Sequence, residues 1–190
     1  MLDKLPSAFF NETESDKTSI QHNYGMLYDL AIEWLLMRNE TIKVLEIGCS
    51  FFGLGSGHAF AAMPFVEKYV GIDAVVPEEK LPPKFIYLNG DAYTENIFGD
   101  IEKHAPFDLV IDDGSHIYEH QLFFMKNYHN FCNPTSVMIC EDVLNNPLSL
   151  IWRFQELDDS IHAVTVPCEY SPDFVDNVAL VRWNREGSHG

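Results

Sequence analysis

Two apolar segments of the sequence end in acidic residues. The segment FDLVIDDGSH carries Asp113, and the segment VMICED ends in Glu141 and Asp142. If both segments form neighbouring parallel strands, their acids meet at the same edge of a sheet. Carboxylates gathered in this way repel one another unless a cation neutralises them, and oxygen ligands favour a hard ion such as Mg²⁺. The sequence therefore predicts a magnesium site at these acids.

A second candidate site follows the strand-like segment KVLEIG. Glu46 and Gly48 lie at its end, and Gly53 and Gly55 lie where the next helix is expected to begin. Glycine at a strand-to-helix turn permits positive φ and lets a ligand approach the backbone closely. Asp73 ends the following strand, where a carboxylate can accept hydrogen bonds from both hydroxyls of a ribose. These residues predict a nucleoside-binding site.

A dinucleotide-binding loop is the closest alternative, because Asp73 lies twenty residues after Gly53. Two features oppose it. Pyrophosphate binding requires a glycine immediately after the strand and no carboxylate close to the phosphates. Glu46 at the strand end instead suits the cationic amino-acid portion of S-adenosylmethionine.

The loop resembles motif I of class I S-adenosylmethionine-dependent methyltransferases. A closer resemblance comes from IDDGSH followed by a strand that ends in ED, a combination similar to the metal-dependent O-methyltransferases of macrolide and related natural-product sugars and to the cephalosporin-hydroxylase-like group. The stretch before the core, with Ser15-Asp16-Lys17 and His22-Asn23-Tyr24, also resembles those families. The resemblance covers roughly residues 15–145.

The resemblance implies roles for individual residues. Asp113, Glu141 and Asp142 become metal ligands, and His116 becomes the general base for a substrate hydroxyl. Asp91 matches the position that receives the adenine amino group. An alcohol is a poor nucleophile until a metal lowers its pKa and a base takes its proton, so the implied chemistry is coherent.

Some of these residues also have ordinary structural interpretations. His116 could simply cap or pack at a helix start, and Asp91 could be a helix N-cap. The spacing of His116 and His120 invites a zinc site, but the surrounding acids favour an oxygen-seeking ion. Strand alternation places Asp112 on the opposite face from Asp113, so we count Asp112 among the cofactor contacts, with bracing of the loop as the alternative.

Strand-like and helix-like segments alternate from residue 43 onward, which favours parallel strands joined by right-handed crossovers. The expected strands are 43–48, 68–73, 84–91, 107–113, 137–142, 162–167 and 178–183, and the expected helices are 58–66, 92–104, 117–131 and 148–157. The short connection between the last two strands leaves no room for a crossover helix. We predict an α/β, three-layer Rossmann-like methyltransferase sandwich with a mostly parallel seven-stranded sheet and one antiparallel strand near the C-terminus.

One domain is expected, because no repeat or linker divides the chain. Residues 41–185 form the predicted methyltransferase core, and 186–190 are interpreted as a remnant of cloning. Residues 1–40 are an N-terminal segment that covers the site, irregular over 1–19 and then helical from Tyr24 to Leu35.

Composition limits the partners. A formal charge of −17 opposes binding to nucleic acid or to an anionic membrane surface, and a small neutral or cationic substrate fits better. The four cysteines show no paired spacing, which favours a reducing, cytoplasmic setting. No apolar run is long enough to span a bilayer. The oligomeric state stays open, a homo-oligomer included.

The chain is therefore predicted to be an enzyme that moves a methyl group from S-adenosylmethionine to a hydroxyl of a small molecule or sugar, assisted by Mg²⁺. Two alternatives remain. The first is a metal-independent N- or carboxyl-methyltransferase, in which the acids are structural. The second is a catalytically idle nucleoside-binding module or assembly subunit.

Overall fold

The computed structural model describes residues 4–13, 15, 17, 24–49 and 54–143, together with the backbone of 161–168 and 177–184. The expected helix 148–157 and the ending 186–190 lie outside the described residues. Among the described helices, none is long and apolar enough to cross a membrane.

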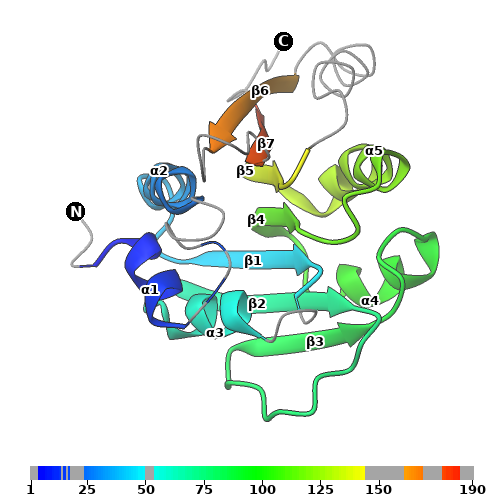
Figure 1. Cartoon of the computed structure of the whole chain (residues 1–190), viewed down its shortest axis with the longest axis horizontal. Helices are drawn as coiled ribbons and strands as arrows, with labels where there is room; N and C mark the ends of the chain where they lie inside the picture. The colour runs from blue at the N-terminus through cyan, green and yellow to red at the C-terminus, as the bar shows by residue number, and fades with distance from the viewer. Residues whose placement is uncertain are drawn as a thin grey trace.

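A sheet with parallel central strands forms the middle layer (Figure 1). Its strands are β1 (Ile42–Ile47), β2 (Val66–Asp73), β3 (Phe85–Asn89), β4 (Phe107–Asp112), β5 (Cys132–Cys140), β6 (Ile161–Cys168) and β7 (Asn177–Asn184). Their order across the sheet is β3-β2-β1-β4-β5-β7-β6. Strands β1 to β5 pair in parallel, and β7 pairs antiparallel with β5 and β6. The parallel part of the sheet confirms the predicted α/β architecture.

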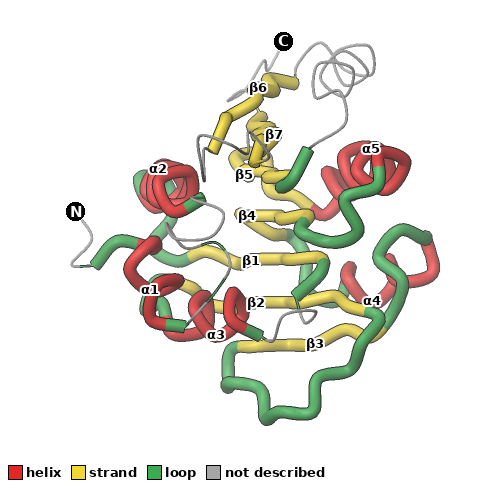
Figure 2. Tube along the Cα trace, viewed as in Figure 1, coloured by secondary structure: helices red, strands yellow, loops and turns green. Residues whose placement is uncertain are grey.

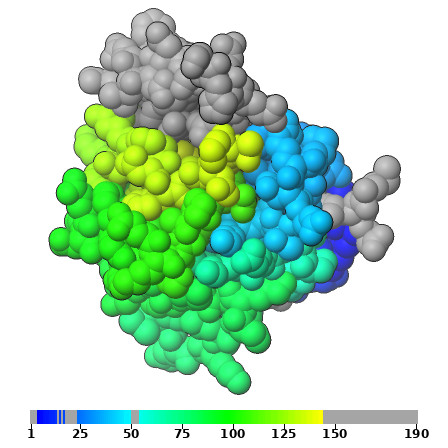
Figure 3. Space-filling model, turned by 180° about the vertical axis from the view of Figure 1, so that it is seen from behind, coloured from blue at the N-terminus to red at the C-terminus, as the bar shows by residue number. Residues whose placement is uncertain are grey.

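Helices cover both faces of the sheet (Figure 2). One face carries α1 (Pro6–Glu12), α2 (Gly25–Leu36) and α3 (Gly55–Ala62), and the other carries the 3₁₀ helix η1 (Glu95–Ile97), α4 (Phe98–Glu102), α5 (Tyr118–Asn127) and the 3₁₀ helix η2 (Tyr128–Phe131). Helix α2 contacts β5. Seen from behind, its light-blue surface lies beside the yellow surface of the segment that ends in β5 (Figure 3).

Strand alternation divides the core between the two faces. Val44 belongs to the cluster under α2 and α3, whereas Leu45 belongs to the cluster under α5. Phe60 and Phe124 are fully buried in these two clusters. Burial of each such side chain contributes roughly 1.5–3 kcal/mol, so both helical layers hold the central strands rigidly in place.

Helix α1 corrects the expectation that residues 1–19 are irregular. Pro6 stands in its first turn, where the missing N–H costs no hydrogen bond. Phe10 is fully buried, with its ring centroid 5.2 Å from those of Tyr28 and Phe60. Tertiary packing therefore stabilises a helix too short to show a clear periodicity.

The predicted helix 92–104 is wrong over much of its length, because only η1 and the short α4 form there. The Asp91 carboxylate accepts a hydrogen bond from the backbone N–H of Tyr93 at 2.9 Å. This turn delays the helical conformation until Glu95. Smaller shifts affect the predicted helix 58–66, observed as α3, and the predicted 117–131, which is split into α5 and η2.

Candidate active site

The acidic residues lie where β4 and β5 end. The backbone N–H of Asp113 donates to the carbonyl of Ile47 at 3.1 Å, and that of Glu141 donates to the carbonyl of Asp112 at 2.9 Å. The parallel ladder thus extends one residue beyond each strand. It brings the acids of the two sequence segments to the same edge of the sheet, as predicted.

Asp113, His116 and Asp142 each offer one ligand atom, and these atoms lie within 4.8 Å of one another. The Nε2 atom of His116 is 3.7 Å from a carboxylate oxygen of Asp142. The side chains are partly accessible, with 34% of His116 and 13% of Asp142 exposed. Two carboxylates and an imidazole form a donor set that fits one divalent cation at an accessible position.

His116 and Asp142 adopt positive φ, at 56° and 48°, although neither is glycine. Such backbone conformations cost about 1–3 kcal/mol and persist only when surrounding contacts enforce them. Around Asp142 those contacts are visible. Tyr24 donates its hydroxyl to the Asp142 carboxylate at 2.7 Å, and Gln121 donates to the Asp142 carbonyl at 3.3 Å. The Asp142 side chain is therefore held in place before any ligand binds.

Glu141 lies outside this group and belongs to a buried charge cluster around Lys17. The Lys17 ammonium is 2.6 Å from Asp113, 3.1 Å from Glu141 and 3.1 Å from Glu46. Its side chain is fully buried. Burial alone lowers the pKa of Lys17, but Asp113, Glu141 and Glu46 raise that pKa well above its usual value. Lys17 is therefore a permanently charged ammonium among carboxylates.

Glu141 is also bound from α2. The Tyr28 hydroxyl donates to one of its carboxylate oxygens. Burial and the neighbouring Glu141 charge raise the pKa of Tyr28, so its proton stays in place as a donor. Both carboxylate oxygens of Glu141 thus accept hydrogen bonds from the chain itself in this conformation.

Glu46, expected at the cofactor, has no exposed surface. Ser56 donates to its carboxylate at 2.8 Å, and the Tyr69 hydroxyl donates to the same oxygen. The other carboxylate oxygen has the Lys17 ammonium at 3.1 Å and no hydrogen-bond partner of good geometry. That oxygen is the atom of Glu46 with capacity for a further donor, directly or through water.

The predicted glycines serve several purposes. Gly48 has φ 83°, and a Cβ there would overlap with the carbonyl of Asp113. A Cβ on Gly55 would lie 2.9 Å from the Cα of Ser15. In both cases the close approach is made by the chain's own backbone. Gly53 lies outside the described residues.

Replacing Gly48 by alanine is expected to lower the free energy of unfolding by at least about 2 kcal/mol, because it adds backbone strain and a clash that separates β1 from Asp113. Gly99→Ala is the matched control, because nothing lies within 4 Å of its added Cβ and the residue is in α4. That substitution should be neutral or stabilising. Urea unfolding of both variants measures the difference, and equal stabilities would refute the strain argument.

Asp73 is the last residue of β2 and Asp91 follows β3, so both lie at the same edge of the sheet. Asp73 accepts a hydrogen bond from the N–H of Val75 at 3.0 Å, and Asp91 accepts from Tyr93. Asp91 is exposed, and the residue that caps η1 is Thr94. The simple N-cap interpretation of Asp91 is therefore wrong, and the binding of a nucleoside by either carboxylate stays a prediction.

Asp112 is 2% exposed and faces the cluster under α5. Tyr93 donates its hydroxyl to Asp112 at 2.6 Å, and the Tyr93 ring stacks on His120 with centroids 4.2 Å apart. Burial raises the pKa of Asp112, and the Tyr93 hydrogen bond opposes that rise. This arrangement braces the loop after β4, and it leaves direct contact of Asp112 with a cofactor as a prediction.

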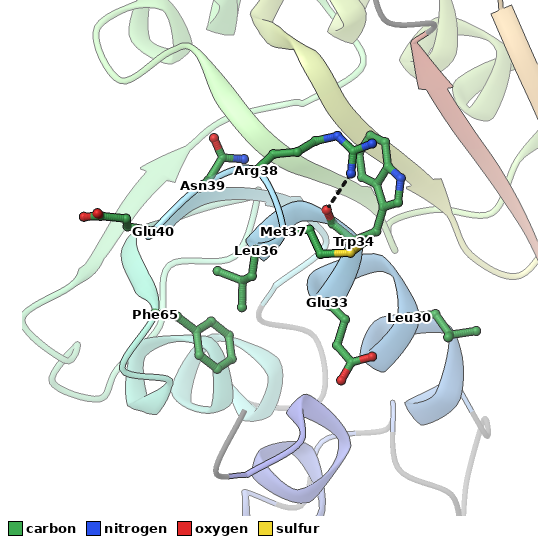
Figure 4. A pocket seen from close by; sticks show the side chains of 9 residues that line it. All are labelled: Leu30, Glu33, Trp34, Leu36, Met37, Arg38, Asn39, Glu40 and Phe65. Carbon is green, nitrogen blue, oxygen red and sulfur yellow. Dashed lines mark hydrogen bonds between the residues drawn. The ribbon is translucent and has the colours of Figure 1, made fainter. Parts of the chain in front are cut away.

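The cavity in Figure 4, of about 1010 Å³, is elsewhere. It is lined by the end of α2 and by residues that precede β1 and β2, among them Trp34, Glu40 and Phe65. Arg38 covers the Trp34 ring at 4.1 Å. Because the cavity adjoins the amino ends of these strands, it is separate from the acidic edge.

Lys17, Tyr24 and Tyr28 are site residues whose roles the sequence did not reveal. Tyr24 and Tyr28 are one helical turn apart in the helix expected from Tyr24 to Leu35, and Tyr24 also belongs to the stretch that the resemblance marked. Lys17 stands in a segment that the resemblance marked, but no spacing rule connects it with acids in distant strands. The spacing of the tyrosines, together with Lys17 seven residues before Tyr24, was the available signal.

Comparisons with known proteins agree on the fold. No family model matches the chain. The "MycE Methyltransferase from the Mycinamycin Biosynthetic Pathway", solved with Mg and SAH, superposes with a TM-score of 0.77 at 20% identity, covering 100% of this chain and 57% of that one. The O-methyltransferase TomG from Streptomyces achromogenes, solved with SAM, gives 0.57 at 16% identity, covering 95% and 88%.

A sequence relative points the same way. The 8-demethyl-8-(2-methoxy-alpha-L-rhamnosyl)-tetracenomycin-C 3'-O-methyltransferase of Streptomyces olivaceus is 31% identical over 114 residues, which are 56% of this chain and 28% of that protein. The chain thus spans 28% of the length of this relative and 57% of the length of the MycE structure. It has the fold of S-adenosylmethionine-dependent methyltransferases, and the predicted resemblance to sugar O-methyltransferases is confirmed.

Proposed function

We propose that this chain transfers a methyl group from S-adenosylmethionine to a hydroxyl of a sugar or other small molecule, with the assistance of Mg²⁺. The observation that carries the proposal is the convergence of Asp113, His116 and Asp142 at the carboxyl edge of a methyltransferase-type sheet. Ligands of open α/β sheets bind at this edge. The antiparallel β7 also fits the seven-stranded arrangement expected of such enzymes.

The proposed metal ligands are Asp113, Asp142 and Glu141. Two of them already lie within reach of one ion, and Glu141 precedes Asp142 directly. Bound there, a divalent cation supplies positive charge that lowers the pKa of the acceptor hydroxyl. The carboxylates hold their positions through Tyr24, Tyr28 and the ladder between β4 and β5.

His116 is the proposed general base. Its Nε2 atom accepts the proton of the acceptor hydroxyl as the oxygen attacks the methyl carbon and the carbon–sulfur bond breaks. Asp142, 3.7 Å away, stabilises the resulting imidazolium. The partly exposed ring of His116 leaves room for an acceptor to approach.

The proposed cofactor site is the neighbouring part of the same edge. Glu46, Gly48 and Gly55 belong to its loop, with Gly53 between them, and Asp73, Asp91 and Asp112 end the strands around it. We also propose the division into an N-terminal segment, 1–40, and a core, 41–185. Lys17 and Tyr24 support it, because both reach from that segment to acids of the core.

Thermal unfolding with S-adenosylhomocysteine should test the donor first. A ligand at about 100 times its dissociation constant adds roughly 2.7 kcal/mol of stability. For a chain of this size the midpoint should rise by about 5 to 10 °C. Mg²⁺ should add a further rise that EDTA removes.

The outcomes separate the candidate functions. A rise with the nucleoside alone would reject the metal assignment. A rise with NAD instead would reject the methyltransferase. Binding without turnover on any hydroxylated acceptor would favour the idle nucleoside-binding module.

One observation favours a metal-independent methyltransferase as the second candidate. Lys17 already neutralises much of the charge of Asp113 and Glu141, so these acids are stable without a metal ion. That enzyme would methylate a nitrogen or a carboxylate, and EDTA would leave its turnover unchanged.

A further inference from the structure

Lys17 is the only cation within 4 Å of Asp113 and Glu141 among the ion pairs of the described residues. The ammonium donates hydrogen bonds to Asp113 and Glu141, and a carboxylate oxygen of Glu46 lies 3.1 Å away as a third anionic neighbour. The side chain crosses from the segment between α1 and α2 to the ends of β1, β4 and β5. It therefore joins the acid of the cofactor loop to the acids of the proposed metal site.

A positive charge is required at this position when no other cation is present. Glu46 and Glu141 are 0% and 2% exposed. A buried carboxylate without a counter-ion is strongly destabilising, because it has lost its hydration without gaining a partner. The tyrosine hydroxyls supply hydrogen bonds to these acids but no charge. Among the residues that the structure describes, the Lys17 ammonium supplies the compensating charge.

The same ammonium opposes a metal ion. A divalent cation bound by Asp113 would lie a few ångströms from a fixed positive charge, and the two would repel each other at short range in a poorly hydrated site. Glu141 cannot turn both oxygens toward a metal while it accepts from Lys17 and Tyr28. Ligation by all the proposed acids thus requires the ammonium to withdraw from at least one of them.

We propose that Lys17 is a positioning residue whose ammonium competes with the divalent cation for Asp113 and Glu141 and thereby sets the affinity of the site for metal. The inference rests on the proposed metal-assisted function. In the metal-free chain Lys17 holds the acids in place. When metal binds, the ammonium moves away from Asp113, and Glu46 retains it.

Manganese binding, measured by electron paramagnetic resonance, tests the competition. Lys17→Met removes the charge and keeps the length of the side chain, and it should bind Mn²⁺ at least tenfold more tightly than the unsubstituted chain. Lys17→Arg keeps the charge and should not gain affinity. Lys4→Met is the matched control, because Lys4 forms an exposed ion pair with Glu12 in the same N-terminal segment. A purely structural Lys17 would predict equal or weaker binding by Lys17→Met.

Each result has a definite meaning. Equal or weaker binding by Lys17→Met, with clear binding by the unsubstituted chain, overturns the competition and leaves the proposed function standing. Binding by Lys17→Met alone supports the competition and overturns metal dependence in the natural chain. If neither the unsubstituted chain nor Lys17→Met binds Mn²⁺, both the competition and the metal dependence are overturned. The response to S-adenosylhomocysteine still tests the methyltransferase separately.

A second measurement does not depend on the variant folding. The ¹H–¹⁵N signal of the Lys17 ammonium in the unsubstituted chain should be observable, because burial protects its protons from exchange with solvent. Saturating Mg²⁺ should shift that signal or broaden it by exposing the ammonium. A Lys17 signal unchanged at a Mg²⁺ concentration that raises the unfolding midpoint would refute the proposal.

Discussion

Replacing His116 by alanine should reduce turnover by about 10²- to 10⁴-fold while leaving the affinity for S-adenosylhomocysteine unchanged. A general base contributes this range to catalysis. His116 lies 3.7 Å from Asp142, at the edge of the sheet and away from the buried core. Alanine keeps the Cβ, so the cost of the positive φ at this position is similar in both chains. Methyl transfer from labelled S-adenosylmethionine to a sugar acceptor measures the rate, and calorimetry measures the affinity.

His58→Ala is the matched control for that experiment. His58 pairs with Glu79 at 3.1 Å on the surface of α3, far along the chain from the acids. Its loss should leave turnover within about twofold, as for most surface substitutions. An unchanged rate in His116→Ala would remove this histidine from the mechanism, and an equal loss in both variants would point to a general effect on the fold.

Asp142→Asn should reduce Mg²⁺-dependent turnover by about 10²-fold or more and abolish the rise of the unfolding midpoint with Mg²⁺. The substitution removes one charged ligand, and a metal site of this kind contributes several kcal/mol to the transition state. Asparagine has the size of aspartate and tolerates the left-handed backbone that Asp142 adopts at φ 48°. Its amide oxygen can still accept from Tyr24, so the local fold should persist.

Asp100→Asn provides the comparison for the loss of a carboxylate. Asp100 is 52% exposed and pairs with Lys103 at 2.5 Å in α4. It should retain both the rate and the Mg²⁺ response. The response to S-adenosylhomocysteine alone should survive in both variants. If Asp142→Asn keeps its Mg²⁺ response, the ion binds elsewhere and the proposed ligand set is wrong.

The parallel strands could be predicted because their residues form short, almost wholly apolar segments between polar ones. The alternation of strands and helices, with the crossover rule, indicated parallel pairing, and the structure shows the register, with Ile47 opposite Asp112 and Asp112 opposite Cys140. The location of Asp113 and Asp142 at one edge was then a geometric consequence. The sequence determines which residues end each strand. Acidic residues at the carboxyl ends of neighbouring parallel strands therefore lie close together at one edge of the sheet.

The charge cluster could not be predicted in the same way. Lys17 lies in a polar segment, and its partners are determined by tertiary packing of α1 and α2 on the sheet. The contacts of the glycines could not be predicted from the sequence either. Sequence reasoning assigned Gly55 to a ligand, whereas the backbone of Ser15 makes the close approach seen here. A glycine indicates that another group approaches the backbone closely. Whether that group is a ligand or the chain's own backbone depends on the rest of the fold.

The span of the Lys17 contacts also determines when the acidic edge is completed during folding. Lys17 is separated by 96 residues from Asp113 and by 124 from Glu141. Contacts so distant in sequence close large loops and form late, after the parallel sheet has assembled. Until the N-terminal segment docks, the acids lack the charge of Lys17. We therefore expect newly synthesised chains to pass through a stage with a formed sheet and an undocked N-terminal segment, and a divalent cation bound by these acids to delay the docking of Lys17.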